Sequence, residues 1–138
     1  MRVLIDINVV IDLLTNRESF AEQARQVFIA CGQEEIEGVL SACEVPTIFY
    51  LLQKHVGKEA ALEHMRTLTQ ALEIVDVNST DVEKALRGDM PDFEDAVLAH
   101  SAKRAKARYI ITRDLKDFSG SPVPAISPTD FIQQHPIT

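Results

Sequence analysis

Short apolar runs alternate along this chain with longer segments in which apolar positions recur every three to four residues. The first run, Val3-Leu4-Ile5, is rich in β-branched residues and predicts a strand, whereas the segments that follow have the period of a helix. The pattern predicts strands over 2–6, 37–41, 73–77, 109–112 and 124–126, and helices over 8–15, 19–32, 43–55, 58–71, 79–87, 92–106 and 127–135.

This regular alternation of strands and helices predicts an α/β fold, with a parallel sheet covered by helices on both faces. A chain of 138 residues is long enough for one domain with its own hydrophobic core, so we expect residues 1–138 to form a single domain. Hydrophobic residues make up 46% of the chain and charged residues 25%, as in an ordinary soluble protein.

The sequence favours a cytoplasmic location. No stretch approaches the ~20 apolar residues that a membrane span requires, so we expect no membrane partner. Asp6 and Asp12 interrupt what would have to be the apolar core of a signal peptide. Cys31 and Cys43 lie in apolar surroundings, which predicts buried free thiols in a reducing compartment.

Acidic residues recur where predicted strands end. Asp6 follows the first strand and Glu44 the second, Asp95 opens a later helix, and Asp114 and Asp117 follow the strand over 109–112. In parallel sheets this edge is where ligands bind. Carboxylates that converge there repel one another unless a divalent cation neutralises them, so we expect Mg²⁺ or Mn²⁺, which can activate water for attack on phosphorus.

Each of these acids also has a simpler explanation. Asp92 and Asp95 stand at a helix start, where capping and the helix dipole stabilise by about 0.5–2 kcal/mol, and we favour the cap for Asp92. Glu44 could be an ordinary helix-start acid, and Asp114 and Asp117 could bind turn backbone.

Two acids near the N-terminus are interpreted differently from each other. Asp6 is the hardest to explain simply, because an unpaired charge beside an apolar strand is costly to bury. Asp12, four residues after Asn8 on a predicted helix, is interpreted as a surface acid rather than as a ligand.

The overall charge does not decide the function. The net charge of −7, from 21 acids against 14 bases, is unlike the basic face of a general nucleic-acid binder, but acids around a metal would be neutralised by it. A basic run is interpreted as a solvated helix end in preference to a phosphate-contacting rim. Its members are Lys103, Arg104, Lys106 and Arg108, followed by Arg113 and Lys116.

Three segments together resemble the PIN-domain family. They are Asp6-Ile7-Asn8-Val9-Val10-Ile11-Asp12-Leu13-Leu14, Asp92-Phe93-Glu94-Asp95-Ala96, and Ile111-Thr112-Arg113-Asp114 with Asp117-Phe118. The segment DFEDAVLAHSA is most similar to the bacterial subgroup related to VapC-type toxins. The resemblance runs from residue 2 to about 132.

The resemblance implies a three-layer α/β/α fold, with a central parallel sheet of about five strands, and an endoribonuclease that depends on Mg²⁺ or Mn²⁺. By position it implies Asp6, Glu44, Asp95 and Asp114 as catalytic acids, Asp6, Asp95, Asp114 and Asp117 as metal ligands, and Asn8, Asp92 and Thr112 as neighbours of the ligands. The implied partners are an RNA substrate, a small antitoxin protein and a second copy of the chain.

The sequence alone leaves some points open. Two residues separate Asp114 from Asp117 where many toxin relatives have one, so either could be the main ligand. One alternative function is a non-catalytic RNA- or protein-binding module. Another is a phosphatase of the haloacid dehalogenase type, although that class needs a second Asp where this chain has Asn8.

Overall fold

The computed structural model describes residues 1–136, which contain a five-stranded parallel sheet with strand order β3-β2-β1-β4-β5. β1 lies at the centre, paired in parallel with β2 and β4. The predicted parallel sheet is thus confirmed. The strands are β1 (Arg2–Ile5), β2 (Glu37–Ser41), β3 (Glu73–Val75), β4 (Tyr109–Ile111) and β5 (Ala125–Ile126).

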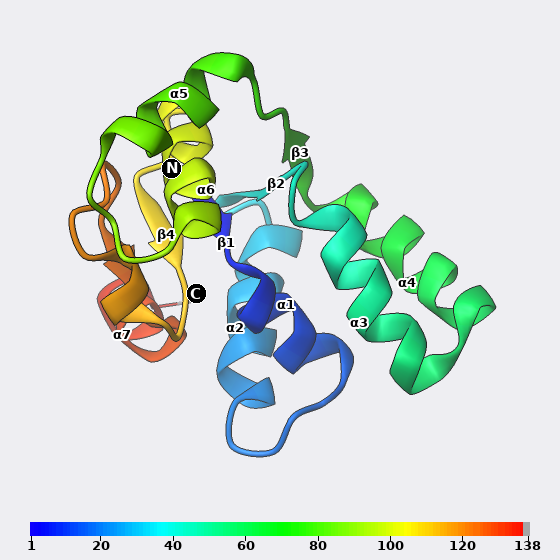
Figure 1. Ribbon diagram of the computed structural model, residues 1–138. Coiled ribbons are helices and arrows are strands. Elements are labelled where there is room, and N and C mark those ends of the chain that lie inside the picture. The colour runs from blue at the N-terminus through cyan, green and yellow to red at the C-terminus, as the bar shows by residue number, and fades with distance from the viewer. Residues whose placement is uncertain (137–138) are drawn as a thin grey trace.

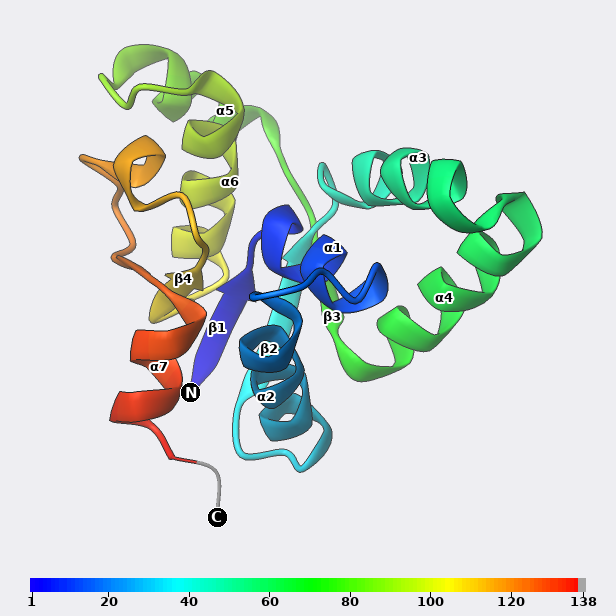
Figure 2. The ribbon, with the colours of Figure 1, turned by 90° about the horizontal axis from the view of Figure 1, so that it is seen from below.

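Helices cover both faces of this sheet, which gives the three layers of an α/β/α fold (Figures 1 and 2). α1, α2 and α7 lie on one face and α5 and α6 on the other, while α3 and α4 form a hairpin that stands out beside α1 (Figure 2). The helices are α1 (Ile7–Leu14), α2 (Ala21–Gly32), α3 (Val45–Val56), α4 (Lys58–Ala71), α5 (Ser79–Arg87), α6 (Phe93–Arg104) and α7 (Pro128–Gln134), with a 3₁₀ turn η1 (Leu115–Phe118).

The central strand shows why its sequence is continuously apolar. Val3 and Ile5 pack into the core beneath α1, α2 and α7, which includes Phe131. Leu4 points the other way and packs in the core beside α6, against Leu98 among others. A strand buried on both faces needs apolar residues at every position, because successive side chains alternate between the faces.

Some predicted boundaries differ from the structure. The helix expected from residue 19 begins at Ala21, and Ser19 has φ +76°, in the left-handed region, so it belongs to a turn. The strand expected over 73–77 ends at Val75. Cys31 is buried and Cys43 partly buried, and both are free thiols. Within residues 1–136, no helix has the length and apolar character needed to cross a membrane.

Candidate active site

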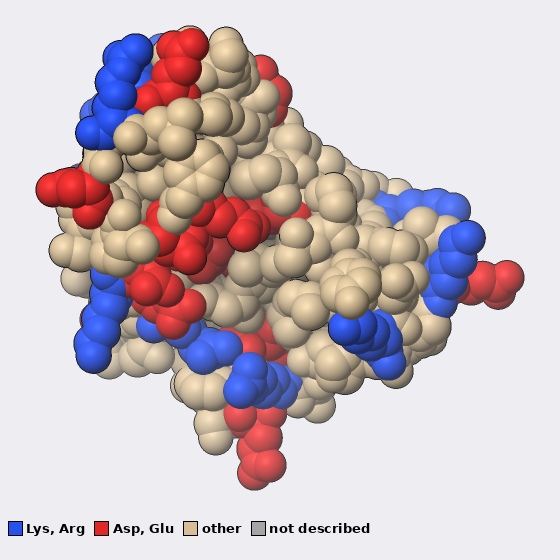
Figure 3. Space-filling model, in the orientation of Figure 1, with Lys and Arg blue, Asp and Glu red and all other residues tan. Residues whose placement is uncertain are grey.

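The carboxyl ends of β2, β1 and β4 bring together residues that are distant in sequence. Asp6 directly follows β1 and is the N-cap of α1. Glu44 follows β2 at the start of α3, and Thr112 directly follows β4. Asp95 comes to the same region from the first turn of α6. Figure 3 shows acidic side chains gathered in the middle of this face of the molecule.

Asp6 is held by hydrogen bonds to both of its carboxylate oxygens. Its Oδ1 accepts a hydrogen bond from the Ile7 amide at 2.8 Å. Its Oδ2 accepts one from the Thr112 hydroxyl at 2.7 Å and one from Asn8 Nδ2 at 3.2 Å. Burial, which leaves Asp6 only 4% exposed, raises the pKa of its carboxyl, and the negative charge of Asp114 raises it further.

Thr112 and Asn8 form a hydrogen-bond network around Asp6. The Thr112 hydroxyl accepts hydrogen bonds from Asn8 Nδ2 at 3.2 Å and from the Asp114 amide at 3.0 Å. Asn8 Oδ1 accepts one from the Arg113 amide at 3.3 Å. Two of the three residues expected to neighbour the ligands, Asn8 and Thr112, therefore contact Asp6 directly and fix its orientation.

Glu44 is a buried carboxyl with one unpartnered oxygen. Its Oε1 accepts a hydrogen bond from the Ser41 amide at 3.1 Å. Its Oε2 is buried and has no hydrogen-bond partner among residues 1–136. Burial, and then the charge of Asp6, raise the pKa of Glu44 well above its usual range. A buried carboxylate oxygen without a donor is costly, so this position favours a proton or a cation.

Asp92 and Asp95 have different roles at the start of α6. Asp92 is the N-cap, and its Oδ1 accepts a hydrogen bond from the Asp95 amide at 2.9 Å, so the expected cap is confirmed. The Asp95 side chain is half-buried. Burial raises its pKa to about 7, with further contributions from the charges of Asp6, Asp92 and Asp117.

Asp114 and Asp117 both act on the acidic cluster, but on different members. The charge of the exposed Asp114 raises the pKa of Asp6, whereas that of the half-buried Asp117 raises the pKa of Asp95. Both acids therefore lie close enough to the acidic cluster for their charges to act on it. We call the set Asp6, Glu44, Asp95, Asp114 and Asp117 the acidic centre.

The composition of the acidic centre fits a hard divalent cation. Its side chains offer carboxylate oxygens, which Mg²⁺ and Mn²⁺ prefer, and burial together with neighbouring acids raises the pKa of Asp6, Glu44 and Asp95, as expected where such a charge is needed. Within the described residues, no three acidic, histidine or cysteine side chains already surround a single point. Side chains of the acidic centre would therefore have to move before three of them could share one ion.

The comparison with family models decides the family. A model described as PIN domain matches residues 2–116. This chain belongs to the PIN domain family. Among curated proteins, ribonuclease VapC1 of Aquifex aeolicus (strain VF5) is 26% identical over an alignment of 141 residues. The alignment covers 96% of this chain and 94% of the relative.

Solved structures share the fold of this PIN domain. A chain of VapBC-1 from nontypeable Haemophilus influenzae has a TM-score of 0.69 and 18% identity, and the match covers 94% of this chain and 99% of that one. VapC20 of Mycobacterium tuberculosis, described as a toxin that cleaves the sarcin-ricin loop, has a TM-score of 0.67 and 16% identity, with 88% and 95% covered. At these identities the match establishes the fold.

One acid of this PIN domain lies where sequence reasoning did not place it. The prediction that Asp12 is a surface acid is wrong: its side chain is 2% exposed and forms an ion pair with Arg113. Asp12 lies one helical turn after Asn8, so both project from the same face of α1 toward the end of β4. That spacing was the available signal, but it does not identify the partner.

The basic run likewise divides into paired and unpaired members. Arg113 pairs with Asp12, and Arg104 pairs with the buried Asp81 at 2.9 Å. The remaining members are exposed and take part in no ion pair within residues 1–136, as expected of a solvated surface. They are Lys103, Lys106, Arg108 and Lys116.

Proposed function

We propose that this PIN domain is a metal-dependent endoribonuclease, with Asp6, Glu44, Asp95 and Asp114 as its catalytic acids. The observation that carries the proposal is the buried, unpartnered oxygen of Glu44 within a cluster of mutually repelling carboxylates. Such an arrangement is unfavourable by itself and becomes favourable when a cation is bound.

Asp6, Asp95, Asp114 and Asp117 would hold Mg²⁺ or Mn²⁺. When bound, such an ion activates water and stabilises the charge that develops on a phosphodiester. Asp6 is suited to its part because a carboxylate has about four lone-pair directions, and the three hydrogen bonds leave one free. Hydrolysis by activated water is expected to leave a 5′-phosphate and a 3′-hydroxyl.

An RNA substrate is favoured by apolar side chains around the acidic centre. Phe93, next to Asp92 at the start of α6, is 51% exposed, and Leu115, next to Asp114, is 45% exposed. Proteins stack unpaired bases on aromatic rings such as that of Phe93, and apolar side chains such as Leu115 can pack against a base. The relative from Aquifex aeolicus is named a ribonuclease. We therefore propose that bases flanking the cleaved bond rest on Phe93 and Leu115.

We further propose that the protein is the toxin of a VapBC-like pair, held by a small antitoxin. Structural neighbours include VapBC assemblies. A hollow of about 220 Å³ between α1 and α3 is lined by Ile7, Ile11 and Leu51, among others, and reaches Asn8. Tyr50 is 53% exposed on the same helix as Leu51. An antitoxin segment with apolar residues for this hollow, and a Lys or Arg for the acidic centre, fits the surface.

Self-association as a homodimer is also expected from the family. Light scattering of the purified protein at several concentrations tests it. A mass of one chain, 15.4 kDa, at every concentration would contradict it.

The test of the nuclease is cleavage of a mixed pool of structured and single-stranded RNAs, with Mn²⁺, with Mg²⁺ and with EDTA. The variants are Asp6→Asn and, as a control, Asp76→Asn, which changes an exposed acid outside the acidic centre. We expect cleavage that requires metal, is lost in Asp6→Asn and is kept in Asp76→Asn.

Identical patterns from wild type and Asp6→Asn would overturn the nuclease. Binding of RNA without cleavage would then favour the non-catalytic module. Release of phosphate from small phosphomonoesters, with a covalent intermediate on Asp6, would favour the phosphatase.

A further inference from the structure

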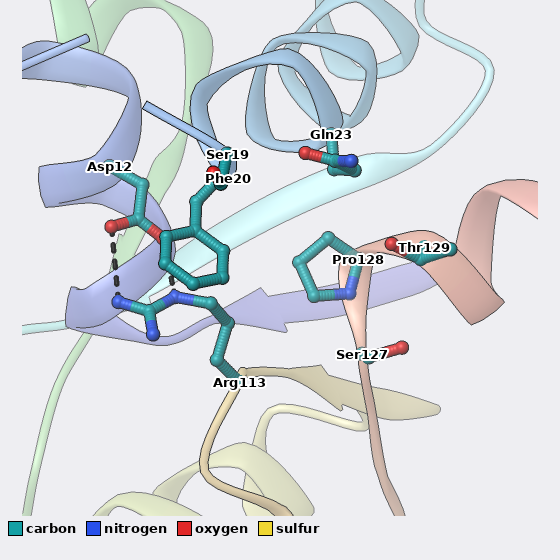
Figure 4. A pocket seen from close by; sticks show the side chains of 8 residues that line it. All are labelled: Asp12, Ser19, Phe20, Gln23, Arg113, Ser127, Pro128 and Thr129. Carbon is teal, nitrogen blue, oxygen red and sulfur yellow. Dashed lines mark hydrogen bonds and ion pairs between the residues drawn. The ribbon is translucent and has the colours of Figure 1, made fainter. Parts of the chain in front are cut away.

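The side chain of Arg113 is fixed on two sides. Its Nε donates to Asp12 Oδ2 at 2.6 Å and its Nη2 to Asp12 Oδ1 at 3.1 Å. Its Cζ lies 4.1 Å from the centre of the Phe20 ring. Figure 4 shows this arrangement at one side of a hollow of about 330 Å³, with Pro128 across from it. A two-point ion pair with a stacked ring allows the guanidinium little freedom.

The backbone of Arg113 is held by the same helix as its side chain. The Arg113 amide donates to Asn8 Oδ1 at 3.3 Å, and the guanidinium pairs with Asp12, one turn further along α1. Residues four apart on a helix lie on one face. α1 therefore binds Arg113 at two points, the backbone amide and the guanidinium.

The neighbours of Arg113 in the chain are Thr112 and Asp114, and both belong to the network at Asp6. A threonine hydroxyl has one hydrogen to donate and two lone pairs. Thr112 donates to Asp6 and accepts from Asn8 and from the Asp114 amide, so its capacity is fully used. A small movement of the chain at Arg113 would break this set of bonds.

Stability is a weak explanation for the ion pair. Apolar side chains of similar volume often replace a buried pair without loss. Arg113 also supplies little free charge to the acidic centre, because Asp12 neutralises it. The ion pair instead fixes the position of the chain at the end of β4.

We propose that Arg113 is a positioning residue, held by Asp12 and Asn8, which keeps the Thr112 hydroxyl on Asp6 and so orients Asp6 for the cation. The inference rests on the proposed function. Arg113 acts through Thr112 and Asp6 and does not itself contact the reacting atoms.

The test compares Arg113→Gln with Arg104→Gln. Arg104 also pairs with an aspartate that is 2% exposed, but that pair joins α5 to α6. The double variant Asp12→Leu/Arg113→Met removes both charges at once, so it leaves no unpaired buried charge that could unfold the protein. Three quantities are measured on each folded protein: Mn²⁺ affinity by calorimetry without RNA, kcat and KM for RNA, and hydrogen exchange of the segment 109–118.

Arg113→Gln and the double variant are expected to lower Mn²⁺ affinity or kcat by about 10–100-fold, the usual effect of losing a partner that orients a ligand. KM for RNA should stay largely unchanged, and the segment 109–118 should exchange faster. Arg104→Gln should change none of these. Arg113→Lys should keep only part of the wild-type Mn²⁺ affinity and kcat, because an ammonium cannot form the two-point pair.

Unchanged exchange of 109–118 in the Arg113 variants would overturn the proposal, and so would equal losses in the Arg104 and Arg113 variants. Faster exchange with unchanged Mn²⁺ affinity and kcat would overturn the link from Arg113 to Asp6. If wild type neither binds Mn²⁺ nor cleaves RNA, the proposed function fails. Hydrogen exchange still shows in that case whether Arg113 fixes the end of β4.

Discussion

Two arginine–aspartate pairs in this protein are alike in chemistry and differ in setting. In each, the aspartate side chain is 2% exposed, and the arginine side chain is 26% exposed in Arg113 and 34% in Arg104. Each aspartate accepts hydrogen bonds on both oxygens from its arginine. The exposure and the hydrogen bonds between each arginine and its aspartate therefore do not show which pair supports the candidate site and which supports the fold.

The difference lies in their neighbours. Asp81 is 23 residues before Arg104 and also forms a capping box with Asn78 at the start of α5, so it is explained by local structure. Asp12 and Arg113 are 101 residues apart and join α1 to the chain that carries Thr112. A buried ion pair is therefore best interpreted from the groups that it holds in place.

Removing the aspartates should have the largest effects and should separate the pairs by stability. Asp81→Ala should lower the free energy of unfolding by about 3 kcal/mol, because it removes a cap and leaves Arg104 with only the exposed Asp76 as a partner. Asp12→Ala should cost less, about 2 kcal/mol, because no cap is lost and Arg113 can turn toward water. Urea denaturation measures both. A larger loss from Asp12→Ala would contradict this ranking.

Removing one hydrogen-bonding group from each region should show which region supports catalysis and which supports stability alone. Thr112→Val keeps the side-chain volume but loses the hydrogen bond to Asp6, and should lower kcat by about 10–100-fold. Asn78→Ala should leave kcat unchanged and cost about 1 kcal/mol of stability through its lost cap. RNA cleavage with excess Mn²⁺ is the measurement, and equal rates for wild type and Thr112→Val would refute the role of this hydroxyl.

The two regions should respond to pH with opposite signs. Burial and neighbouring acids raise the pKa of Asp95 to about 7, so its contribution to stability without metal is full below pH ~4 and is lost as pH rises toward 7. Burial alone would raise the pKa of Asp81, but hydrogen bonds from Arg104 and Asn78 lower it. Its contribution is therefore present above pH ~4 and is lost as pH falls below its lowered pKa.

Urea denaturation in EDTA from pH 4 to 7.5 tests the first half of this prediction. Wild type should lose more stability across that window than Asp95→Asn, whose amide does not ionise. Parallel curves for the two proteins would show that Asp95 is not the group that titrates.

The smallest expected effect concerns exposed apolar side chains in the two regions. Phe93→Ala should raise KM for RNA by about fivefold, since stacking of a base is worth about 1–3 kcal/mol and the ring is only partly available. Leu86, which is 69% exposed on α5, provides the control, and Leu86→Ala should leave KM unchanged. The same KM for both variants would remove Phe93 from the substrate surface.

Much of this fold could be predicted from the sequence, because its signals are local. A continuous, β-branched apolar run such as Val3-Leu4-Ile5 is typical of a strand buried on both faces, and Asn78 and Asp92 mark helix starts by their own side chains. Ser19 was misleading, because its side chain suits a cap while its backbone lies in a left-handed turn.

That acidic residues gather at this edge of the sheet could be predicted, whereas their individual contacts could not. Parallel strands bring the ends of β2, β1 and β4 together, so Asp6, Glu44 and Thr112 meet. Asp12 can be buried because it pairs with Arg113, which lies 101 residues away in the chain. A local sequence pattern does not reveal a contact over that separation. The positions of Asp114 and Asp117 likewise depend on the path of η1.

In its hydrogen bonds with Ile7, Asn8 and Thr112, the Asp6 carboxylate is always the acceptor, and this limits the chemistry that it can perform. Asn8, Thr112 and the Ile7 amide all donate to it. A carboxylate whose lone pairs are engaged in this way is a poor nucleophile and a poor relay for protons. It remains a good fixed negative charge. An aspartate at position 8 would remove one of these bonds and set two anions against each other, so the amide of Asn8 helps to decide which chemistry this sheet edge can support.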